Sequence, residues 1–335
     1  MAKDSSTADR PVYWGDDGLR AGCLVMSDKP AILVVQPHLA PFAAMLENEF
    51  TVWRLWQGPP LEASHTIGAL LVAGEFPIDQ ALAESLPELG LIACFTSGYD
   101  GVDLAWARER GLKVSHSPGV NHDDVADQAI GLMLAAWRGL IEGDAIVRES
   151  RWRPTEKRIT RSLAGMKLGV VGLGAIGEAT ARRAEAFGLK VAWWGPNEKP
   201  EAAWPRAESL LALARDSDIL IVAARASDDN RVLISRAVIE ALGPHGLLVN
   251  VARGQLVDET ALIAALKDGR LGQAALDVFE TEPTPAARWA DVPNVVLSPH
   301  TAGATTAAAP KMLALTRENL RRFFAGEPLV NPVVE

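Results

Sequence analysis

The sequence predicts an α/β protein built from two doubly wound parallel sheets with a cleft between them. Three observations carry this prediction. Short apolar segments alternate with helical ones from Ala31 onward, which is the pattern of βαβ units. A glycine-rich turn, GLGAIG at Gly172–Gly177, joins a predicted strand to a predicted helix. The chain has 335 residues, of which 48% are hydrophobic and 22% charged, so it is long enough for two domains.

The first predicted unit is a small sheet of the flavodoxin-like kind. Its strands are expected at Ala31–Val35, Thr51–Leu55, Ile67–Val72, Leu91–Phe95 and Lys113–Ser115. Its helices are expected at Pro41–Glu49, Pro77–Ser85 and Leu104–Arg110. Residues 1–27 are polar and glycine-rich, which predicts a disordered extension, and Met26 is an alternative start. Pro118-Gly119 breaks the chain after the last strand, so this unit is placed at residues 28–120.

The second predicted unit, residues 121–304, opens with one long apolar helix at Asp123–Glu149. Its strands are expected at Lys167–Val171, Leu189–Trp194, Ile219–Ala223, Leu247–Val251, Gln273–Leu276 and Asn294–Leu297. Its further helices are expected at Ile176–Phe187, Ala207–Arg215, Ser235–Leu242 and Glu259–Lys267. An amphipathic helix at Thr306–Phe324 follows, and residues 305–335 are expected to return to the first unit.

The turn at Gly172–Gly177 predicts a dinucleotide site. Glycines between a strand and a helix let the backbone approach a pyrophosphate, whose charge then lies at the helix N-terminus. Such a pattern alone is often only a tight turn, but here a second strand follows the helix, as in a Rossmann dinucleotide-binding domain. The residues expected to contact the coenzyme are Gly172, Gly174, Ala175, Ile176 and Gly177.

Four polar residues follow the last three strands of the second unit. Arg253 comes after the fourth strand, and Asp277 and Glu282 come after the fifth. His300 comes after the sixth. Ligands of parallel sheets bind at the carboxyl ends of the strands, so we expect these side chains to meet there. Each alone is compatible with a structural role, but together they supply a cation for a carboxylate, a histidine acid/base and an acid that orients it.

Composition excludes several classes of protein. The net charge is −9 and there is no basic run, which argues against a nucleic-acid or membrane-surface partner. The N-terminus has no apolar leader, and no stretch reaches membrane-spanning length. The two cysteines, Cys23 and Cys94, form no CxxC pair, so we expect a reducing compartment, the cytoplasm, and no metal site.

Four motifs resemble the D-isomer-specific 2-hydroxyacid dehydrogenase family. They are GLGAIG, NVARGQLVDE (Asn250–Glu259), ALDVFETEP (Ala275–Pro283) and LSPHTAG (Leu297–Gly303). In addition, FTSGYDGVDL (Phe95–Leu104) resembles the substrate loop of the family, and the whole match runs from about Pro30 to the C-terminus. The resemblance implies that the first unit is a substrate domain and that the second binds the coenzyme.

The resemblance also implies a role for each of these residues. Arg253 would bind the carboxylate and keto oxygen of the substrate. His300 would protonate the carbonyl oxygen while Glu282 hydrogen-bonds its imidazole. Asp277 would hold the nicotinamide carboxamide, and the backbone N–H groups of Ser97 and Gly98 would bind the substrate carboxylate.

The segments CFTSGYDGVDL, ADQAIGLMLA, EALGPHG and RLWQGPP resemble one branch of the family, the glyoxylate/hydroxypyruvate and hydroxyphenylpyruvate reductases. This implies reduction of a small 2-ketoacid (glyoxylate, hydroxypyruvate or an aryl pyruvate) to the D-2-hydroxyacid. It also implies a homodimer in which the long helix and the arm Arg148–Arg161 form the dimerisation element, although a solvated, charge-rich helix end would look the same. One alternative stays open, a non-catalytic, NAD(H)-sensing corepressor on the same fold. A formate-dehydrogenase-like enzyme would have an amide as the partner of the histidine, so Glu282 argues against that class.

The end of the second strand of the second unit favours NADP(H) over NAD(H). An NAD site needs an acid there for the ribose hydroxyls, and Gly195 stands in its place. Pro196 stands where NADP-binding relatives have arginine, so Asn197, Lys199 and Arg225 are the candidates to compensate. Glu198 is a rival that could take the ribose of NAD instead.

Overall fold

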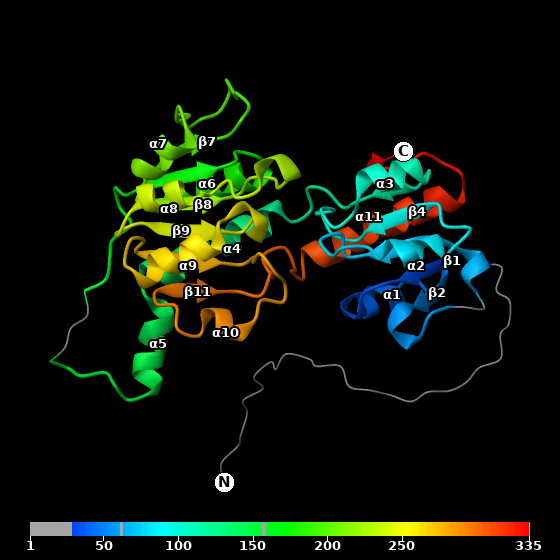
Figure 1. Ribbon diagram of the computed structural model, residues 1–335, viewed down its shortest axis with the longest axis horizontal. Coiled ribbons are helices and arrows are strands. Elements are labelled where there is room, and N and C mark those ends of the chain that lie inside the picture. Colours follow the sequence, from blue (N-terminus) through cyan, green and yellow to red (C-terminus); the bar gives the residue numbers. More distant parts are fainter. Residues whose placement is uncertain (1–28, 61–62, 156–158, 335) are drawn as a thin grey trace, which may run out of the picture.

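The computed structural model describes residues 29–60, 63–155 and 159–334, and the predicted extension at residues 1–27 lies outside them. It contains two six-stranded sheets, each with helices on both faces. Figure 1 shows them as two bodies side by side, joined by the segments before α4 and before α11. The predicted α/β class with two parallel, doubly wound sheets is confirmed. No helix of the described residues combines the length and the apolar character needed to cross a membrane.

The first sheet has the strand order β12-β5-β4-β3-β1-β2. Its strands are β1 (Ala31–Val34), β2 (Thr51–Arg54), β3 (Ile67–Val72), β4 (Leu91–Cys94), β5 (Lys113–Ser115) and β12 (Pro332–Val334). All pairs are parallel except β12, which pairs antiparallel with β5. The C-terminal tail therefore returns to the first unit, as expected, and adds an edge strand that the sequence pattern did not predict.

The second sheet has the strand order β11-β10-β9-β8-β6-β7, and all its pairs are parallel. Its strands are β6 (Lys167–Val171), β7 (Lys190–Trp194), β8 (Ile219–Val222), β9 (Leu247–Asn250), β10 (Gln273–Leu276) and β11 (Val295–Leu297). The chain order reverses between β6 and β8, which is the switch point where ligands bind in sheets of this type.

The helices divide between the faces of the two sheets. Those with the first sheet are α1 (Ala40–Ala44), α2 (Gln80–Glu84), α3 (Leu104–Glu109) and α11 (Ala308–Phe324). Those with the second are α4 (His122–Trp137), α5 (Leu140–Arg148), α6 (Ala175–Ala186), α7 (Leu210–Arg215), α8 (Arg236–Leu242), α9 (Glu259–Lys267) and α10 (Ala286–Trp289). α4 and α6 cover one face of the second sheet, whereas α7, α8 and α9 cover the other.

Alternating strand residues explain why both faces of each sheet are covered. Ile219 and Ile221 of β8 point into the core with α4 and α6, and Leu220 and Val222 point into the opposite core. All four side chains are fully buried. Strands that are apolar on both faces can be stable only with helices on each side, which is the architecture found here.

The prediction of one long helix over Asp123–Glu149 is wrong. The helix ends at Trp137, with Arg138 as its C-cap, and α5 starts anew after Gly139, whose φ of +61° lies in the left-handed region. The N–H of Gly139 donates to the carbonyl of Ala136 at 3.0 Å, which closes the last turn of α4. Glycine adopts this conformation at little cost and commonly stops a helix, so a single residue overrides an otherwise continuous apolar pattern.

The predicted domain limits, 28–120 with 305–335 and 121–304, fall in the two segments that connect the bodies. These limits and the function of each unit stay predictions.

Candidate active site

The glycine turn after β6 is shaped to bring backbone close to a ligand. Gly172 has φ +90°, and a Cβ there would lie 2.5 Å from the Cα of Ala224. A Cβ at Gly177 would collide with the carbonyl of Gly172. In contrast, a Cβ at Gly174 would meet no described atom within 4 Å, so the start of α6 faces open space. Gly174 is the N-cap of α6 and makes no side-chain cap, which leaves the N–H groups of Ala175 and Ile176 near this opening.

This geometry fits the pyrophosphate of a dinucleotide. The first N–H groups of a helix lack intrahelical partners and carry the positive end of the helix dipole, so they attract an anion. The N–H of Gly172 donates to the carbonyl of Trp194 at 2.8 Å, which holds the turn against the end of β7.

Glu282 and His300 form a close pair at the carboxyl ends of β10 and β11. Oε2 of Glu282 lies 2.5 Å from Nδ1 of His300, while Oε1 accepts the N–H of Phe279 at 2.9 Å. Both side chains are mostly buried, at 22% and 27% exposure. Because Nδ1 is held by the carboxylate, Nε2 is the ring nitrogen that can exchange a proton with a ligand.

The pair shifts the pKa values of both residues. Burial opposes the charge of the imidazolium, but the hydrogen bond and negative charge of Glu282 outweigh it and raise the pKa of His300. Burial also opposes the charge of Glu282, but the hydrogen bond and charge of His300, together with the N–H of Phe279, lower the pKa of that carboxyl. The imidazolium therefore persists to a higher pH than that of an isolated histidine.

Asp277 fixes the backbone of the segment that carries His300. Its carboxylate accepts the N–H of Thr301 at 3.1 Å and the N–H of Ala302 at 2.9 Å, and its carbonyl accepts the N–H of His300 at 2.8 Å. His300 itself has φ +53°, an uncommon value for a residue other than glycine. The Asp277 side chain is fully buried, so these bonds fix the backbone of His300 in this uncommon conformation.

Arg253 extends from the end of β9 toward the first unit. Its turn is braced by Asn250, whose side chain donates to the carbonyl of Arg253 at 3.0 Å and accepts the N–H of Ala252 at 3.0 Å. Nε of Arg253 donates to Oδ2 of Asp100 at 2.8 Å. Burial opposes the charge of Arg253, but the hydrogen bond and charge of Asp100, with the charges of Glu75 and Glu282, raise its pKa above the ordinary value.

The loop after β4 meets Arg253 from the opposite side. A Cβ at Gly98 would fall on Nη2 of Arg253, so the guanidinium lies directly against the backbone of this glycine. Oγ of Ser97 donates to the carbonyl of Ser117 at 2.6 Å, which anchors the loop. A second contact joins the two units nearby, because the guanidinium of Arg225 donates to the Tyr99 hydroxyl and lies 4.8 Å from the centre of that ring.

Arg253 thus contacts Gly98 of the first unit, and its charge acts on Glu282 and His300 of the second. The sequence reasoning missed Asp100 and Glu75, whose charges act on Arg253. Asp100 lies inside the FTSGYDGVDL motif and was a visible acid, but nothing in the motif itself indicated its partner 153 residues away.

The residues predicted to hold the coenzyme ribose lie around the end of β7. Gly195 is buried there, and Asn197 is exposed on the following turn. Nζ of Lys199 donates to the carbonyl of Leu173 in the glycine turn and lies 3.4 Å from Oε1 of Glu178. Arg225, the third candidate, is instead engaged with Tyr99.

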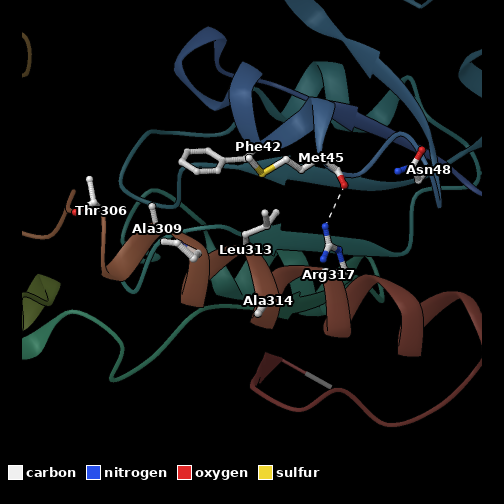
Figure 2. Close-up of a pocket in the computed structure, with 9 residues that line it drawn as sticks. Phe42, Met45, Asn48, Thr306, Ala309, Leu313, Ala314 and Arg317 are labelled. Carbon is white, nitrogen blue, oxygen red and sulfur yellow. Dashed lines mark hydrogen bonds between the residues drawn. The ribbon is translucent and has the colours of Figure 1, made fainter. Parts of the chain in front are cut away.

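A cavity of about 690 Å³ lies elsewhere, between α1 and α11 of the first unit (Figure 2). Its lining is largely apolar and includes Phe42, Met45 and Leu313. Arg317 at its edge donates to the carbonyl of Met45 at 3.0 Å and pairs with Glu49. None of the site residues described above lines it, so it is separate from the candidate active site. Among the described residues, no cluster of three or more histidine, cysteine or acidic side chains could hold a metal ion.

Comparisons with known proteins give the family. Residues 130–302 match the model of the D-isomer specific 2-hydroxyacid dehydrogenase, NAD binding domain. The chain is 39% identical to the hydroxyphenylpyruvate reductase of Plectranthus scutellarioides, over 90% of this chain and 98% of that one. It is also 39% identical to the glyoxylate/hydroxypyruvate reductase A of Arabidopsis thaliana, over 88% of this chain and 97% of that one.

Solved structures agree. A 2-hydroxyacid dehydrogenase from Ketogulonicigenium vulgare is 43% identical, with a TM-score of 0.84, covering 91% of this chain and 98% of that chain. The NADPH-dependent glyoxylate/hydroxypyruvate reductase of Sinorhizobium meliloti, in complex with NADP and malonate, is 34% identical with a TM-score of 0.83, covering 91% and 97%. The chain therefore belongs to the D-isomer-specific 2-hydroxyacid dehydrogenase family and is an NAD(P)-dependent enzyme.

Proposed function

We propose that this enzyme reduces a small 2-ketoacid (glyoxylate, hydroxypyruvate or an aryl pyruvate) to the D-2-hydroxyacid, with NADPH as the preferred coenzyme. The observation that carries the proposal is the Glu282–His300 hydrogen bond, in a pair whose charges interact with that of Arg253. The names of the full-length relatives, which are reductases of such ketoacids, support the substrate class.

Arg253 and the loop at Ser97 and Gly98 would hold the substrate. A guanidinium presents parallel N–H donors that match a carboxylate and a neighbouring keto oxygen, and its raised pKa keeps it charged. The backbone of the loop lies against this guanidinium, so the N–H groups of Ser97 and Gly98 would donate to the same carboxylate. Two sets of donors would fix the keto group in one orientation, which gives the reaction its stereochemistry.

His300 would act as the general acid. The coenzyme, when bound, supplies hydride to the carbonyl carbon, and the C=O π electrons move onto oxygen. Nε2 of His300 donates the proton that converts this oxygen to a hydroxyl, and the neutral imidazole then regains a proton from solvent. Glu282 stabilises the imidazolium beforehand and fixes the tautomer that has its N–H at Nδ1 after transfer.

Residues on the second sheet would bind the coenzyme. The turn with Gly172, Gly174 and Gly177, followed by Ala175 and Ile176, fits the pyrophosphate. Asp277 accepts two backbone N–H groups, and a carboxylate has about four acceptor sites, so it keeps acceptor capacity for the nicotinamide carboxamide. Gly195 offers no acid that would repel a 2′-phosphate, and Asn197 and Lys199 are donors on the same turn.

Kinetics with a substrate panel test the proposal. Oxidation of NADPH and NADH is followed with glyoxylate, hydroxypyruvate and hydroxyphenylpyruvate, and the configuration of the product is determined. His300→Gln is expected to lower kcat about 10²- to 10⁴-fold, the usual contribution of general acid catalysis. Arg253→Gln is expected to lower kcat/KM by at least about tenfold, because it removes a charged hydrogen-bond partner. Tight coenzyme binding with no turnover on any ketoacid would instead support a coenzyme-sensing corepressor.

We further propose a homodimer that forms through α5 and the segment after it. α5 projects away from the second sheet (Figure 1). Five apolar side chains are exposed there, namely Leu140, Ile141, Val147, Trp152 and Ile159. A second copy of the chain that packed on these side chains would remove their apolar surface from water. Light scattering should give twice the mass of one chain for the wild type, and one chain for Ile141→Glu/Trp152→Glu. Leu211→Glu on α7, the control, should stay dimeric.

A further inference from the structure

The segment from Trp204 to Ala207 is hydrogen-bonded along β7, at the edge of the second sheet. β7 is the edge strand, and its partner on this side is the stretch from Trp204 to Ala207. The N–H of Trp193 donates to the carbonyl of Pro205 at 3.0 Å, and the N–H of Ala207 donates to the carbonyl of Trp193 at 2.8 Å. The indole of Trp193 donates to the carbonyl of Trp204 at 3.0 Å. These bonds fix the backbone of Arg206, which lies between them.

The side chain of Arg206 is thereby directed to the carboxyl end of β7. Its Nη2 donates to the carbonyl of Gly195 at 2.8 Å, and its Cζ lies 5.8 Å from the centre of the Trp193 ring. Gly195 stands at the position where an acid binds the adenosine ribose in NAD-dependent relatives of this fold. A third of the Arg206 side chain, 32%, is exposed, so a ligand can reach the guanidinium.

Two cations lie close to Gly195 in the chain or in space, but they engage different partners. Lys199 reaches into the glycine turn at Leu173, whereas Arg206 lies on the Gly195 carbonyl itself. Glu198 is the acid closest to this guanidinium among the described contacts, with Oε1 3.9 Å from Nη1. Its side chain is 85% exposed, so this ion pair is loose, solvated and easily displaced by a better anion.

We propose that Arg206 binds the 2′-phosphate of NADP(H) and is the main determinant of coenzyme choice in this chain. A phosphate monoester carries nearly two negative charges and accepts two parallel N–H bonds from a guanidinium, which a ribose hydroxyl cannot do. Arg206 thus supplies the guanidinium that is missing at Pro196, from a position eleven residues after Gly195. The inference rests on the NADPH preference in the proposed function and names the residue that causes it.

Equilibrium binding tests this without turnover. Isothermal titration calorimetry gives Kd for NADP⁺ and for NAD⁺ with the wild type, Arg206→Gln and Arg206→Lys. Arg206→Gln should raise the Kd for NADP⁺ by about 10- to 100-fold, as expected for loss of charged hydrogen bonds. The Kd for NAD⁺ should change less than about twofold, because NAD⁺ lacks the 2′-phosphate. The Kd of Arg206→Lys for NADP⁺ should lie between those of the wild type and Arg206→Gln, since lysine keeps the charge but lacks the planar guanidinium.

Arg215→Gln is the matched control. Arg215 ends α7 four residues before the amino end of β8, whereas Gly195 follows the carboxyl end of the parallel strand β7, so the two residues belong to opposite ends of the strands. Its loss removes one positive charge from the same unit and should leave both Kd values unchanged.

The ratio of the two Kd values decides between outcomes. Equal weakening of NADP⁺ and NAD⁺ by Arg206→Gln would show that Arg206 only shapes the turn at Gly195, which overturns the inference. A wild type that does not favour NADP⁺ also overturns it, together with the coenzyme preference, while ketoacid reduction stands. Selective loss of NADP⁺ binding in an enzyme that reduces no ketoacid would uphold Arg206 and reject the proposed reaction.

Discussion

Nε of Arg253 donates to Oδ2 of Asp100 at 2.8 Å, and this bond joins the two units at the candidate active site. Arg253 follows β9 of the second sheet, whereas Asp100 follows β4 of the first. The ion pair occupies Nε of Arg253. Nη2 of the same guanidinium lies against the backbone of Gly98. The position of the proposed substrate clamp therefore depends on an acid from the other unit.

Asp100→Asn is expected to lower kcat/KM for the ketoacid by about 10- to 100-fold. The substitution keeps the size of the side chain but removes the charged partner of Arg253, and such hydrogen bonds contribute about 1.5–3 kcal/mol. Steady-state kinetics measure the effect. Asp103→Asn is the control, since Asp103 caps α3 and asparagine caps equally well, so its kinetics should match the wild type. An active Asp100→Asn enzyme would mean that Arg253 is positioned without this acid.

Gly98→Ala should raise KM for the ketoacid more than tenfold while the protein stays folded. The new methyl group would occupy the position of Nη2 of Arg253, so the guanidinium must move away from the substrate loop. Gly131→Ala in α4 provides the comparison, because a Cβ there meets no described atom within 4 Å and alanine favours a helix. Unchanged KM in Gly98→Ala would place the substrate away from this loop.

Glu282→Gln should shift the alkaline limb of the pH profile of ketoacid reduction to lower pH. Reduction needs the imidazolium, which is present below the pKa of His300 and lost as the pH rises through it. Burial lowers this pKa and Glu282 raises it to a greater extent, so removing the carboxylate charge must lower the pKa. The profile of kcat/KM against pH measures the shift. Glu280→Gln, a charge change in the same turn that does not touch His300, should leave the profile in place.

Gly195→Asp should reverse the coenzyme preference from NADPH to NADH. The new carboxylate would repel a 2′-phosphate, accept hydrogen bonds from ribose hydroxyls and neutralise Arg206, which lies on the Gly195 carbonyl. The site can accept the side chain, since a Cβ lies 3.3 Å from the Trp193 ring and needs only a small adjustment.

Kinetics with both coenzymes give the answer, and Gly195→Asn is the control of equal size without charge. That variant should keep the preference of the wild type. A wild-type kcat/KM that is higher with NADH would mean that Glu198, or the backbone of the turn, binds the ribose.

Part of this protein is determined by sequence alone. The alternation of apolar strands with helices predicted two parallel sheets, because apolar periodicity is a local property that survives in the fold. The glycine turn was likewise predictable, since the positive φ of Gly172 and the close approach of Gly177 to the Gly172 carbonyl require residues without a Cβ. The pairing of Glu282 with His300 was expected from their places after neighbouring strands, and the two side chains do meet.

Tertiary structure decided the rest. Gly139 broke a helix that its apolar pattern would have continued, because one left-handed residue outweighs the propensity of its neighbours. Asp100 and Arg253 are 153 residues apart, and Arg206 and Gly195 are eleven apart. Contacts of this kind depend on how the two sheets pack and how a segment is bonded along an edge strand. The sequence shows which chemical groups each side chain offers. Which of these groups come into contact depends on the folded backbone.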